Sequence, residues 1–470
     1  MIIRTTRGIA ASLLLGVAGL APLAAVHAQE LFAAPERLTE GQVSFAGAER
    51  GTPILAGGTV VASGSGFRPG QAVSLLYGAT PLPTGSLVAD AEGRFETRFA
   101  LPADAVAGNH AIVVVAQAPY AATIANLKVS PAIPLSGQAG FDVRRATVTR
   151  GLYQSAYSQR NNAVFVTAAV GRPPVRESEL LRLDADTLAV EARVTPAAAP
   201  ARPGRDGQQQ DGGVYAVYGV GVDDANGNVW VTNSRQNTVA VYRQSDLSLV
   251  RQFDPGTVNH ARDVVIDQGL GKAYASATFQ PEIVVFDAAA PDVRSRIAIE
   301  TGQRGKTFSA ASLSLDSSAH RLYVVSNSTN EVAVIDTASD RVLNVFPVPG
   351  ARGTIGVSHD PRTGRIFVAA QGSDNLVILD GASGAVVTDT PVGAGALNVV
   401  FDPVGQRAYV ANRGANTVTV VDAEGRITAN LGPAPMANHV STDGRGNIFA
   451  VTKGGAEQED ANSLWRIRAS

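Results

Sequence analysis

The stretch 409–422, YVANRGANTVTVVD, is the clearest copy of a pattern that decides the fold. It begins with an aromatic residue followed by small and β-branched residues, passes through a Gly/Asn turn, and ends an apolar run with an aspartate. Two runs of β-branched residues on either side of a turn are typical of antiparallel strands. We therefore expect a β-hairpin here.

The same pattern returns through the C-terminal two thirds of the chain. Its copies begin at seven aromatic residues: Phe165, Trp230, Tyr274, Tyr323, Phe367, Tyr409 and Phe449. From Trp230 onward, successive aromatic residues are 40 to 49 positions apart. An aspartate lies seven residues before five of them (Asp223, Asp267, Asp316, Asp360, Asp402) and another lies 13 residues after four of them (Asp287, Asp336, Asp380, Asp422). We interpret these nine aspartates as residues that form Asx turns.

A repeat of this length predicts one four-stranded sheet per copy. A single sheet cannot bury both of its faces, so the units are expected to stack radially into a closed ring. Seven aromatic residues indicate seven blades. The last copy ends at 464–468, where its third strand should end, and we expect residues 141–148 to supply the missing fourth strand. Such a closure would leave no exposed sheet edge.

Residues 1–28 have the layout of a secretory signal. Arg4 and Arg7 precede an apolar core over 9–25, and small residues at 26–28 predict cleavage after Ala28. The protein is then expected in the periplasm or outside the cell, with no membrane span once the signal is removed. A retained N-terminal anchor is the alternative.

Residues 40–130 predict a separate unit of short strands, an immunoglobulin-like β-sandwich. Residues 64–70, GSGFRPG, resemble the GxGFxPG turn of bacterial immunoglobulin-like modules. Residues 131–140 carry two prolines and are expected to be a stiff linker. The predicted fold class is therefore all-β, with a seven-bladed propeller over 141–470 behind a small sandwich.

Composition narrows the classes of function. The chain has 39 basic and 41 acidic residues and no cysteine. Disulfides, thiolate metal sites and cysteine nucleophiles are therefore excluded. Loss of Arg4 and Arg7 with the signal would take the net charge from −2 to −4, which disfavours nucleic acid or an anionic membrane as a partner of the whole surface.

The repeats resemble those of the YVTN β-propeller family, on the residues YVAN at 409–412 and NTVTVVD at 416–422. The export signal and the size make the chain similar to the periplasmic YncE-like proteins of that family. The N-terminal sandwich is an addition to the minimal member of that group. The resemblance implies a link to iron-limitation responses or envelope transport, and single-stranded DNA as a partner. Tyr153, Tyr215 and Tyr218 could stack bases near Arg262 and Arg352.

One rim of the ring is predicted to carry the binding site. It collects the loops that enter each first strand and the turns between second and third strands, and three of these are enlarged: 171–177, 196–213 and 455–460. Long loops on a rigid scaffold commonly bind ligands. The candidate ligand-binding residues are Tyr153, Arg172, Arg176, Tyr218, Asn233, Arg235, His260, Arg262, Lys306, Arg352, Asn398, Asn412, Arg413, His439 and Lys453.

Cationic and amide side chains outnumber acids in this set, with Asp263 and Asp374 as exceptions, so we expect a small polar or anionic ligand, or a protein partner. The sequence assigns no catalytic residue, no metal ligands and no cofactor. It favours an exported, non-catalytic binding protein over an enzyme. A lactonase-like propeller, for which His260 and Arg262 would act without calcium, is one alternative, and a cell-surface structural or adhesion protein is another.

Overall fold

The computed structural model describes residues 41–118, 120–203, 207–454 and 458–470. The predicted signal, with its cleavage site and the alternative of a retained anchor, lies outside these residues. The described elements are β-strands with two short 3₁₀ turns, η1 (Gln138–Gly140) and η2 (Ser234–Gln236). In these parts of the chain no helix is long and apolar enough to cross a membrane.

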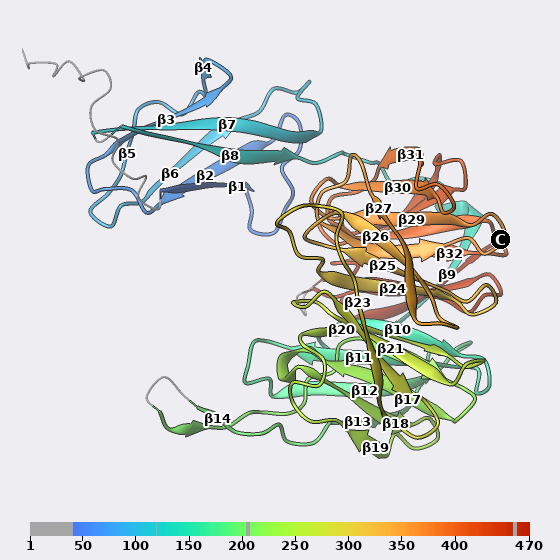
Figure 1. Cartoon of the computed structure of the whole chain (residues 1–470). Helices are drawn as coiled ribbons and strands as arrows, with labels where there is room; N and C mark the ends of the chain where they lie inside the picture. The colour runs from blue at the N-terminus through green and yellow to red at the C-terminus, as the bar shows by residue number, and fades with distance from the viewer. Residues whose placement is uncertain (1–40, 119, 204–206, 455–457) are drawn as a thin grey trace, which may run out of the picture.

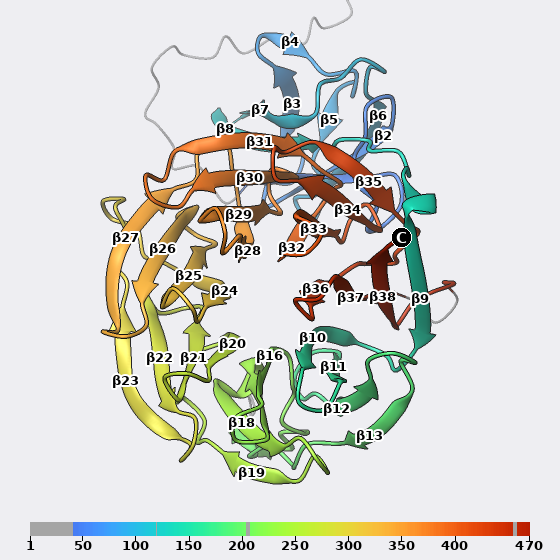
Figure 2. The same cartoon turned by 90° about the vertical axis from the view of Figure 1, so that its right-hand side faces the viewer.

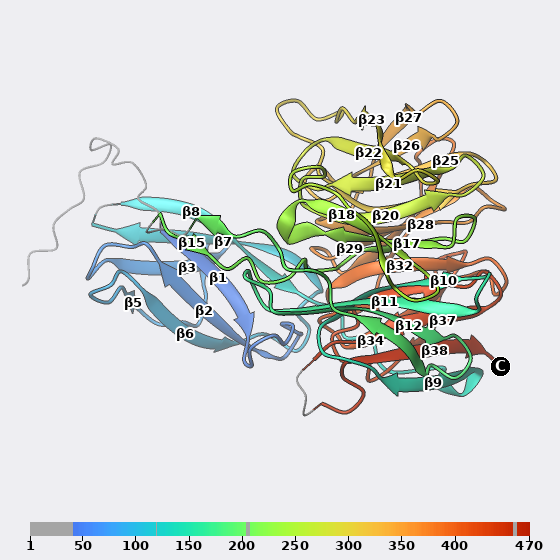
Figure 3. The ribbon, with the colours of Figure 1, turned by 90° about the horizontal axis from the view of Figure 1, so that it is seen from below.

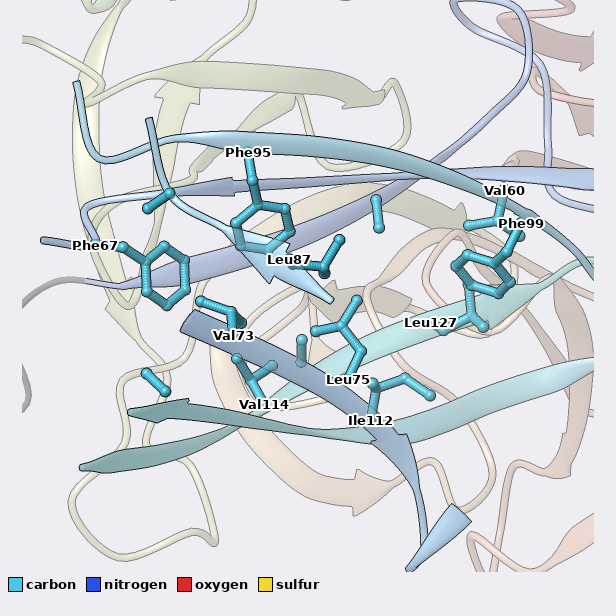
Figure 4. Close-up of a cluster of buried hydrophobic side chains, with 14 of the residues drawn as sticks. Val60, Phe67, Val73, Leu75, Leu87, Phe95, Phe99, Ile112, Val114 and Leu127 are labelled. Atoms are coloured by element: carbon cyan, nitrogen blue, oxygen red, sulfur yellow. The ribbon is translucent and has the colours of Figure 1, made fainter. Parts of the chain in front are cut away.

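The N-terminal unit consists of two facing β-sheets. One contains β1 (Gln42–Gly47), β2 (Thr59–Ser65) and β6 (Phe95–Ala100), and the other contains β3 (Ala72–Tyr77), β4 (Thr80–Pro81), β5 (Leu87–Val88), β7 (Gly108–Gln117) and β8 (Ala121–Val129). Every second residue of β2 is buried, and so are Val73 and Leu75 of β3, as expected for strands with one face on a core. Side chains such as Leu75, Phe95 and Leu127 fill the space between the sheets (Figure 4).

The described residues beyond this unit form seven four-stranded antiparallel sheets and a two-stranded hairpin. Six sheets are continuous in sequence: β10 (Leu152–Ser158), β11 (Ala163–Val170), β12 (Glu177–Asp184), β13 (Val190–Val194); β16 (Val220–Asp223), β17 (Asn228–Asn233), β18 (Thr238–Arg243), β19 (Leu249–Gln252); β20 (Ala261–Asp267), β21 (Lys272–Ala277), β22 (Glu282–Asp287), β23 (Asp292–Ala298); β24 (Ala310–Asp316), β25 (Arg321–Ser326), β26 (Glu331–Asp336), β27 (Arg341–Pro347); β28 (Thr354–His359), β29 (Arg365–Ala370), β30 (Asn375–Asp380), β31 (Val386–Pro391); β32 (Ala396–Asp402), β33 (Arg407–Asn412), β34 (Thr417–Asp422) and β35 (Ile427–Leu431).

The seventh sheet joins the two ends of this region. It contains β36 (His439–Thr442), β37 (Asn447–Val451) and β38 (Ser463–Ala469), and its outer strand is β9 (Phe141–Thr147). Thr147 pairs with Ser463 and Phe141 pairs with Ala469 at the two ends of the β9–β38 ladder. The guanidinium of Arg145 lies 4.3 Å from the ring centroid of Trp465. This is the pairing that the sequence predicts for residues 141–148.

The seven sheets are arranged around a common axis, with the first strand of each sheet innermost (Figure 2). Each first strand contacts the first strand of the next sheet, through β10, β16, β20, β24, β28, β32, β36 and back to β10. The aromatic residues that mark the repeats lie between sheets: Phe165, Trp230, Tyr274, Phe367 and Tyr409 have no exposed side-chain surface. Burial of one such side chain contributes roughly 1.5–3 kcal/mol to folding.

The repeat aspartates close turns on the rim opposite the predicted site. Asp422 Oδ1, for example, accepts the backbone N–H groups of Glu424 at 3.0 Å and of Arg426 at 2.8 Å. The other eight also accept backbone N–H groups two or three residues further on. Their interpretation as Asx-turn residues therefore agrees with the hydrogen bonds.

The sandwich lies against the other rim, which we call the mouth rim: the loops entering the first strands and the turns between second and third strands. Figures 1 and 3 show the sandwich on one side of the ring, and the small hairpin of β14 (Arg202–Pro203) and β15 (Gln209–Gln210) extends from that same side. In Figure 2 the sandwich lies behind the sheets of β28–β31 and β32–β35. The sequence did not predict that the sandwich would share the rim of the candidate site.

Candidate functional site

A cavity of about 200 Å³ opens at the mouth rim, over the ends of the innermost strands. It is lined by the first residues of β10, β20, β28, β32 and β36 and by two turns between second and third strands: Tyr153, Gln154, Arg262, Ile355, Gln371, Leu397, Asn398, Arg413, Asn438 and His439. Tyr153, Arg262, Asn398, Arg413 and His439 belong to the set predicted from the sequence. The cavity thus brings together residues from five of the seven sheets.

Tyr153 lies at the centre of an aromatic and cationic group on one side of the cavity. The Nζ atom of Lys453 is 4.4 Å from the Tyr153 ring centroid, in the range of a cation–π contact. The ring of Tyr218 meets that of Tyr153 edge to face, with centroids 4.9 Å apart. Arg235 Nε donates to the Tyr218 hydroxyl at 3.4 Å. These four residues were all predicted from the sequence.

The cations of the mouth have no acidic partner among the described residues. None of the ion pairs among the described residues involves Arg262, Arg413 or Lys453. In the same described residues, Arg262 Nε is buried without a hydrogen-bond partner. Burying a charged donor without a partner costs free energy that an anionic ligand could restore.

The two acids that the sequence placed here do not neutralise them. Asp263 accepts the backbone N–H groups of Leu313 and Val264, both at 3.0 Å, and burial raises the pKa of its carboxyl group although Arg262 is nearby. Asp374 faces the sandwich and binds Lys128. The mouth is therefore left with excess positive charge.

Burial, together with the neighbouring cations, lowers the pKa of three bases at the mouth rim. Burial, with Arg413 nearby, lowers the pKa of Lys453 to about 7. Burial and Arg262 lower the pKa of His439 to about 3, so its imidazole is neutral at pH 7. Burial, Arg235 and Arg262 also lower the pKa of His260. An anion that entered the mouth would raise the pKa of each of these bases.

Several polar residues of the cavity wall also tie neighbouring sheets together. Gln154 Oε1 accepts the N–H of Val220 at 3.1 Å, and Asn398 Oδ1 accepts the N–H of Val440 at 2.9 Å. His439 Nδ1 accepts the N–H of Ser155 at 3.4 Å, which leaves its Nε2 as a donor in the neutral ring. Asn398 and His439 thus have a structural role besides any contact with a ligand.

Gln154 and Asn438 also line the cavity. Sequence reasoning missed Gln154, and it placed Asn438 among the polar residues of the mouth without including it in the candidate ligand-binding set. Asn438 Nδ2 donates to the Tyr153 carbonyl at 2.7 Å, and its Oδ1 is buried without a partner among the described residues. The sequence feature that could identify such residues is a polar side chain at the start of the first strand of a repeat.

The structure places the other predicted residues away from this cavity. Asn233 and Asn412 are fully buried inside their sheets, where Asn233 donates to the Ala216 carbonyl and Asn412 to Thr417 and Thr419. They cannot contact a ligand in the mouth, because their side chains complete the sheet ends instead. Four further predicted cations are exposed on loops: Arg172, Arg176, Lys306 and Arg352. Arg176 forms an ion pair with Asp211 at 2.8 Å. His260 is half-buried against Phe279, with ring centroids 4.5 Å apart.

A second, larger cavity of about 810 Å³ lies between the sandwich and the ring. Its sandwich wall comes from β1, residues 49–54 of the following loop and the end of β8, and its other wall comes from the mouth rim. Gln371 and Arg413 line both this cavity and the mouth. The two cavities are therefore adjacent and share a boundary.

The described residues hold no group of three or more His, Asp or Glu side chains placed to bind a metal. A Ser–His–Asp group does lie at the far end of the inner strands: Ser314 Oγ is 2.8 Å from His359 Nδ1, and Asp316 Oδ2 is 3.8 Å from His359 Nε2. The second distance is too long for the hydrogen bond that orients a catalytic imidazole. Asp316 Oδ1 meanwhile closes its turn.

Comparison with known proteins identifies relatives of the ring. No family model matches the chain. It is 23% identical over 334 residues to the uncharacterized protein YncE of Salmonella typhimurium, across 68% of this chain and 88% of that protein. It is also 23% identical over 263 residues to YncE of Escherichia coli K12, across 54% and 68% of the two chains.

Solved structures show the same architecture at lower identity. Virginiamycin B lyase from Staphylococcus aureus superposes with a TM-score of 0.51 and 13% identity, over 70% of this chain and 100% of that one. Kuenenia stuttgartiensis hydrazine synthase superposes with a TM-score of 0.54 and 16% identity, over 68% and 96%. The chain therefore carries a YncE-like β-propeller, and the structural likeness concerns the fold alone.

Proposed function

We propose that the protein is an exported, non-catalytic binding protein whose propeller mouth takes a small anionic ligand. The observation that carries this proposal is a group of three cations that have no ion pair among the described residues: Arg262 and Arg413 line the same cavity as Tyr153, and Lys453 lies over the Tyr153 ring. Guanidinium and ammonium groups bind carboxylate, sulfate and phosphate oxygens through charge-assisted hydrogen bonds. A partly buried setting strengthens those bonds relative to bulk water.

The proposal extends to the number of blades and to the type of the N-terminal domain. We propose that the seven sheets are the seven blades of a YVTN-repeat propeller, and that the two-sheet unit before them is an immunoglobulin-like domain. The continuous cycle of inner strands supports seven blades, and the facing sheets with one shared core support the sandwich.

Export is proposed from the layout of residues 1–28, with the periplasm or the cell exterior as the location. Expression of the full chain in a Gram-negative host, followed by intact-mass measurement of the fractionated protein, tests this part. We expect a mature chain that begins at Gln29. A full-length mass, with all protein in the cytoplasm, would contradict export.

Isothermal titration calorimetry tests the binding itself. The probes are sulfate, acetate and malonate at low ionic strength, with neutral acetamide as the control ligand. We expect the anions to bind and acetamide not to bind. R262Q, R413Q and K453M should each weaken sulfate binding about 10- to 100-fold, because one charge-assisted hydrogen bond is worth roughly 1.5–3 kcal/mol.

Two exposed residues of the same rim supply matched controls. R352Q and K306M remove the same charges from loops outside the cavity and should leave sulfate affinity within twofold. Equal losses in the mouth and control variants would attribute binding to the general surface potential and reject the mouth as the site. Measurable hydrolysis of a lactone panel that depends on His260 and Arg262 would favour the enzymatic alternative.

A further inference from the structure

The mouth and the interdomain cavity are neighbours that share part of their linings. Gln371 and Arg413 belong to the lining of both, and they lie on turns of neighbouring sheets, β29–β30 and β33–β34. A ligand that extended from the mouth into the space under the sandwich would pass these two residues. The sandwich then becomes a wall of the binding site.

The volumes indicate the size of the ligand. Pockets that hold organic ligands typically measure roughly 300–1,000 Å³. The mouth, at about 200 Å³, is smaller than this and suits a single anionic group. The interdomain cavity, at about 810 Å³, is within the range and has room for several residues of an extended chain.

The lining of the larger cavity indicates the chemistry of that chain. Four amide side chains line it, two of them on or near the turns that it shares with the mouth: Asn126, Gln371, Asn416 and Gln458. Such side chains both donate and accept hydrogen bonds and therefore suit peptide groups. Phe45, Ile54 and Met436 add apolar surface for side chains.

Charge gives the ligand a direction. Lys128 is neutralised by Asp374, with 2.8 Å between Nζ and Oδ1. Glu49 and Arg50, of opposite sign, are exposed on the sandwich loop. Among the described residues, two cations of this cavity have no ion pair: Arg50, which is exposed on the sandwich loop beside Glu49, and Arg413, which also lines the mouth together with Arg262. Positive charge is therefore concentrated on the side toward the mouth. An anionic end would therefore lie at the mouth and an uncharged body under the sandwich.

We propose that the mouth and the interdomain cavity together bind a short peptide whose C-terminal carboxylate enters the mouth and whose preceding residues lie between the sandwich and the propeller. This deepens the proposed function and rests on it. The walls are held in place by the contacts of Lys128 and Ser130 with Asp374 and by a 3.2 Å hydrogen bond from Asn109 Nδ2 to the Gly372 carbonyl.

Calorimetry with three probes tests the proposal: N-acetyl-trialanine with a free carboxylate, the same peptide with a C-terminal amide, and acetate. We expect the peptide acid to bind at least 10-fold more tightly than acetate and at least 10-fold more tightly than the amide. Equal affinity of peptide acid and acetate would overturn the peptide site, as would equal affinity of acid and amide.

A pair of substitutions locates the body of the peptide. Ala46 is exposed on β1 and lines the interdomain cavity, whereas Ala48 is exposed on the following loop and does not. A46W should lower peptide affinity at least 10-fold and leave sulfate affinity unchanged, and A48W should change neither. If A46W leaves peptide affinity unchanged, the peptide site is wrong, whereas the proposed function stands as long as sulfate still binds in a way that depends on Arg262. If wild type binds neither the peptide nor sulfate, both the peptide site and the proposed function are wrong.

Discussion

Lys128 and Asp374 join the two domains, with 2.8 Å between Nζ and Oδ1. The carboxylate of Asp374 is only 1% exposed, and it also accepts Ser130 Oγ at 2.7 Å and the N–H of Gly395 at 2.7 Å. Lys128 makes a further bond to the Gln371 carbonyl at 3.1 Å. One carboxylate thus connects the end of β8 with two loops of the mouth rim, and it determines where the sandwich lies relative to the cavity.

Replacing this carboxylate should loosen the sandwich. In D374N the charge that pairs with Lys128 is lost, and we expect the domain contact to weaken by about 1–2 kcal/mol because Lys128 is 33% exposed and its charge is partly screened. Hydrogen–deuterium exchange should show faster exchange at Gly395 and along the end of β8. D380N is the control: Asp380, at the other end of β30, closes a turn on the opposite rim, so its replacement should leave the exchange rates of those amides unchanged. Protection at Gly395 that equals wild type would contradict the role of Asp374.

Anion affinity should depend on pH through Lys453. Burial and Arg413 hold the pKa of this amine at about 7, so it is mostly charged at pH 6 and mostly neutral at pH 8. A bound anion raises that pKa, and binding therefore takes up protons. Sulfate, which does not titrate in this range, should bind up to about 10-fold more tightly at pH 6 than at pH 8. K453R stays charged and should lose this dependence; an unchanged pH profile in K453R would point to a different group.

The same pKa has a consequence for stability. Lys453 titrates near 7 in the folded protein and near its usual value of 10.5 in the unfolded chain. Between these two values the unfolded chain binds more protons, so this residue favours the folded state increasingly as pH rises from about 7 to about 10.5. The free energy of unfolding of K453M, measured by urea titration, should therefore gain on that of wild type as pH falls from 10 to 7. A constant difference across this range would refute the low pKa.

Much of the ring follows from the sequence because each repeat is a local pattern. The aromatic residues, the turn aspartates and the Gly/Asn turns all act within about 20 residues of each other, and Asp422 closes the turn that its position suggests. The β9–β38 pairing is long-range, yet it could be predicted because the last repeat lacks a strand and only one unassigned segment precedes the first repeat.

The site could be predicted only in part, because its residues are positioned by contacts that no local pattern encodes. Position on the mouth rim correctly grouped Tyr153, Arg262 and Arg413. It could not separate them from Asn412, whose short side chain bonds to Thr417 and Thr419 inside its own sheet. The docking of Lys128 on Asp374 joins residues 246 positions apart, and nothing in either segment alone indicates the other.

Two equivalent tyrosines of the repeat provide a stability test that is independent of any ligand. Tyr274 and Tyr409 have no exposed side-chain surface, and both occupy the aromatic position of their repeats. The hydroxyl of Tyr274 lies 3.2 Å from the Thr337 carbonyl and 3.1 Å from Asp340 Oδ1. The hydroxyl of Tyr409 is buried with no hydrogen-bond partner in the described residues, and burial raises its pKa to about 12.

Replacing each tyrosine with phenylalanine should therefore have different effects at the two positions. Y274F removes a satisfied buried hydroxyl and should lower the free energy of unfolding by about 1–2 kcal/mol, whereas Y409F removes an unsatisfied one and should leave it unchanged or raise it by up to ~1 kcal/mol. Urea unfolding followed by tryptophan fluorescence reports on the ring, because Trp230 and Trp465 are both buried in it. Equal destabilisation by the two variants would show that the Tyr409 hydroxyl has a partner in solution, which a buried water could provide by bridging it to a nearby carbonyl.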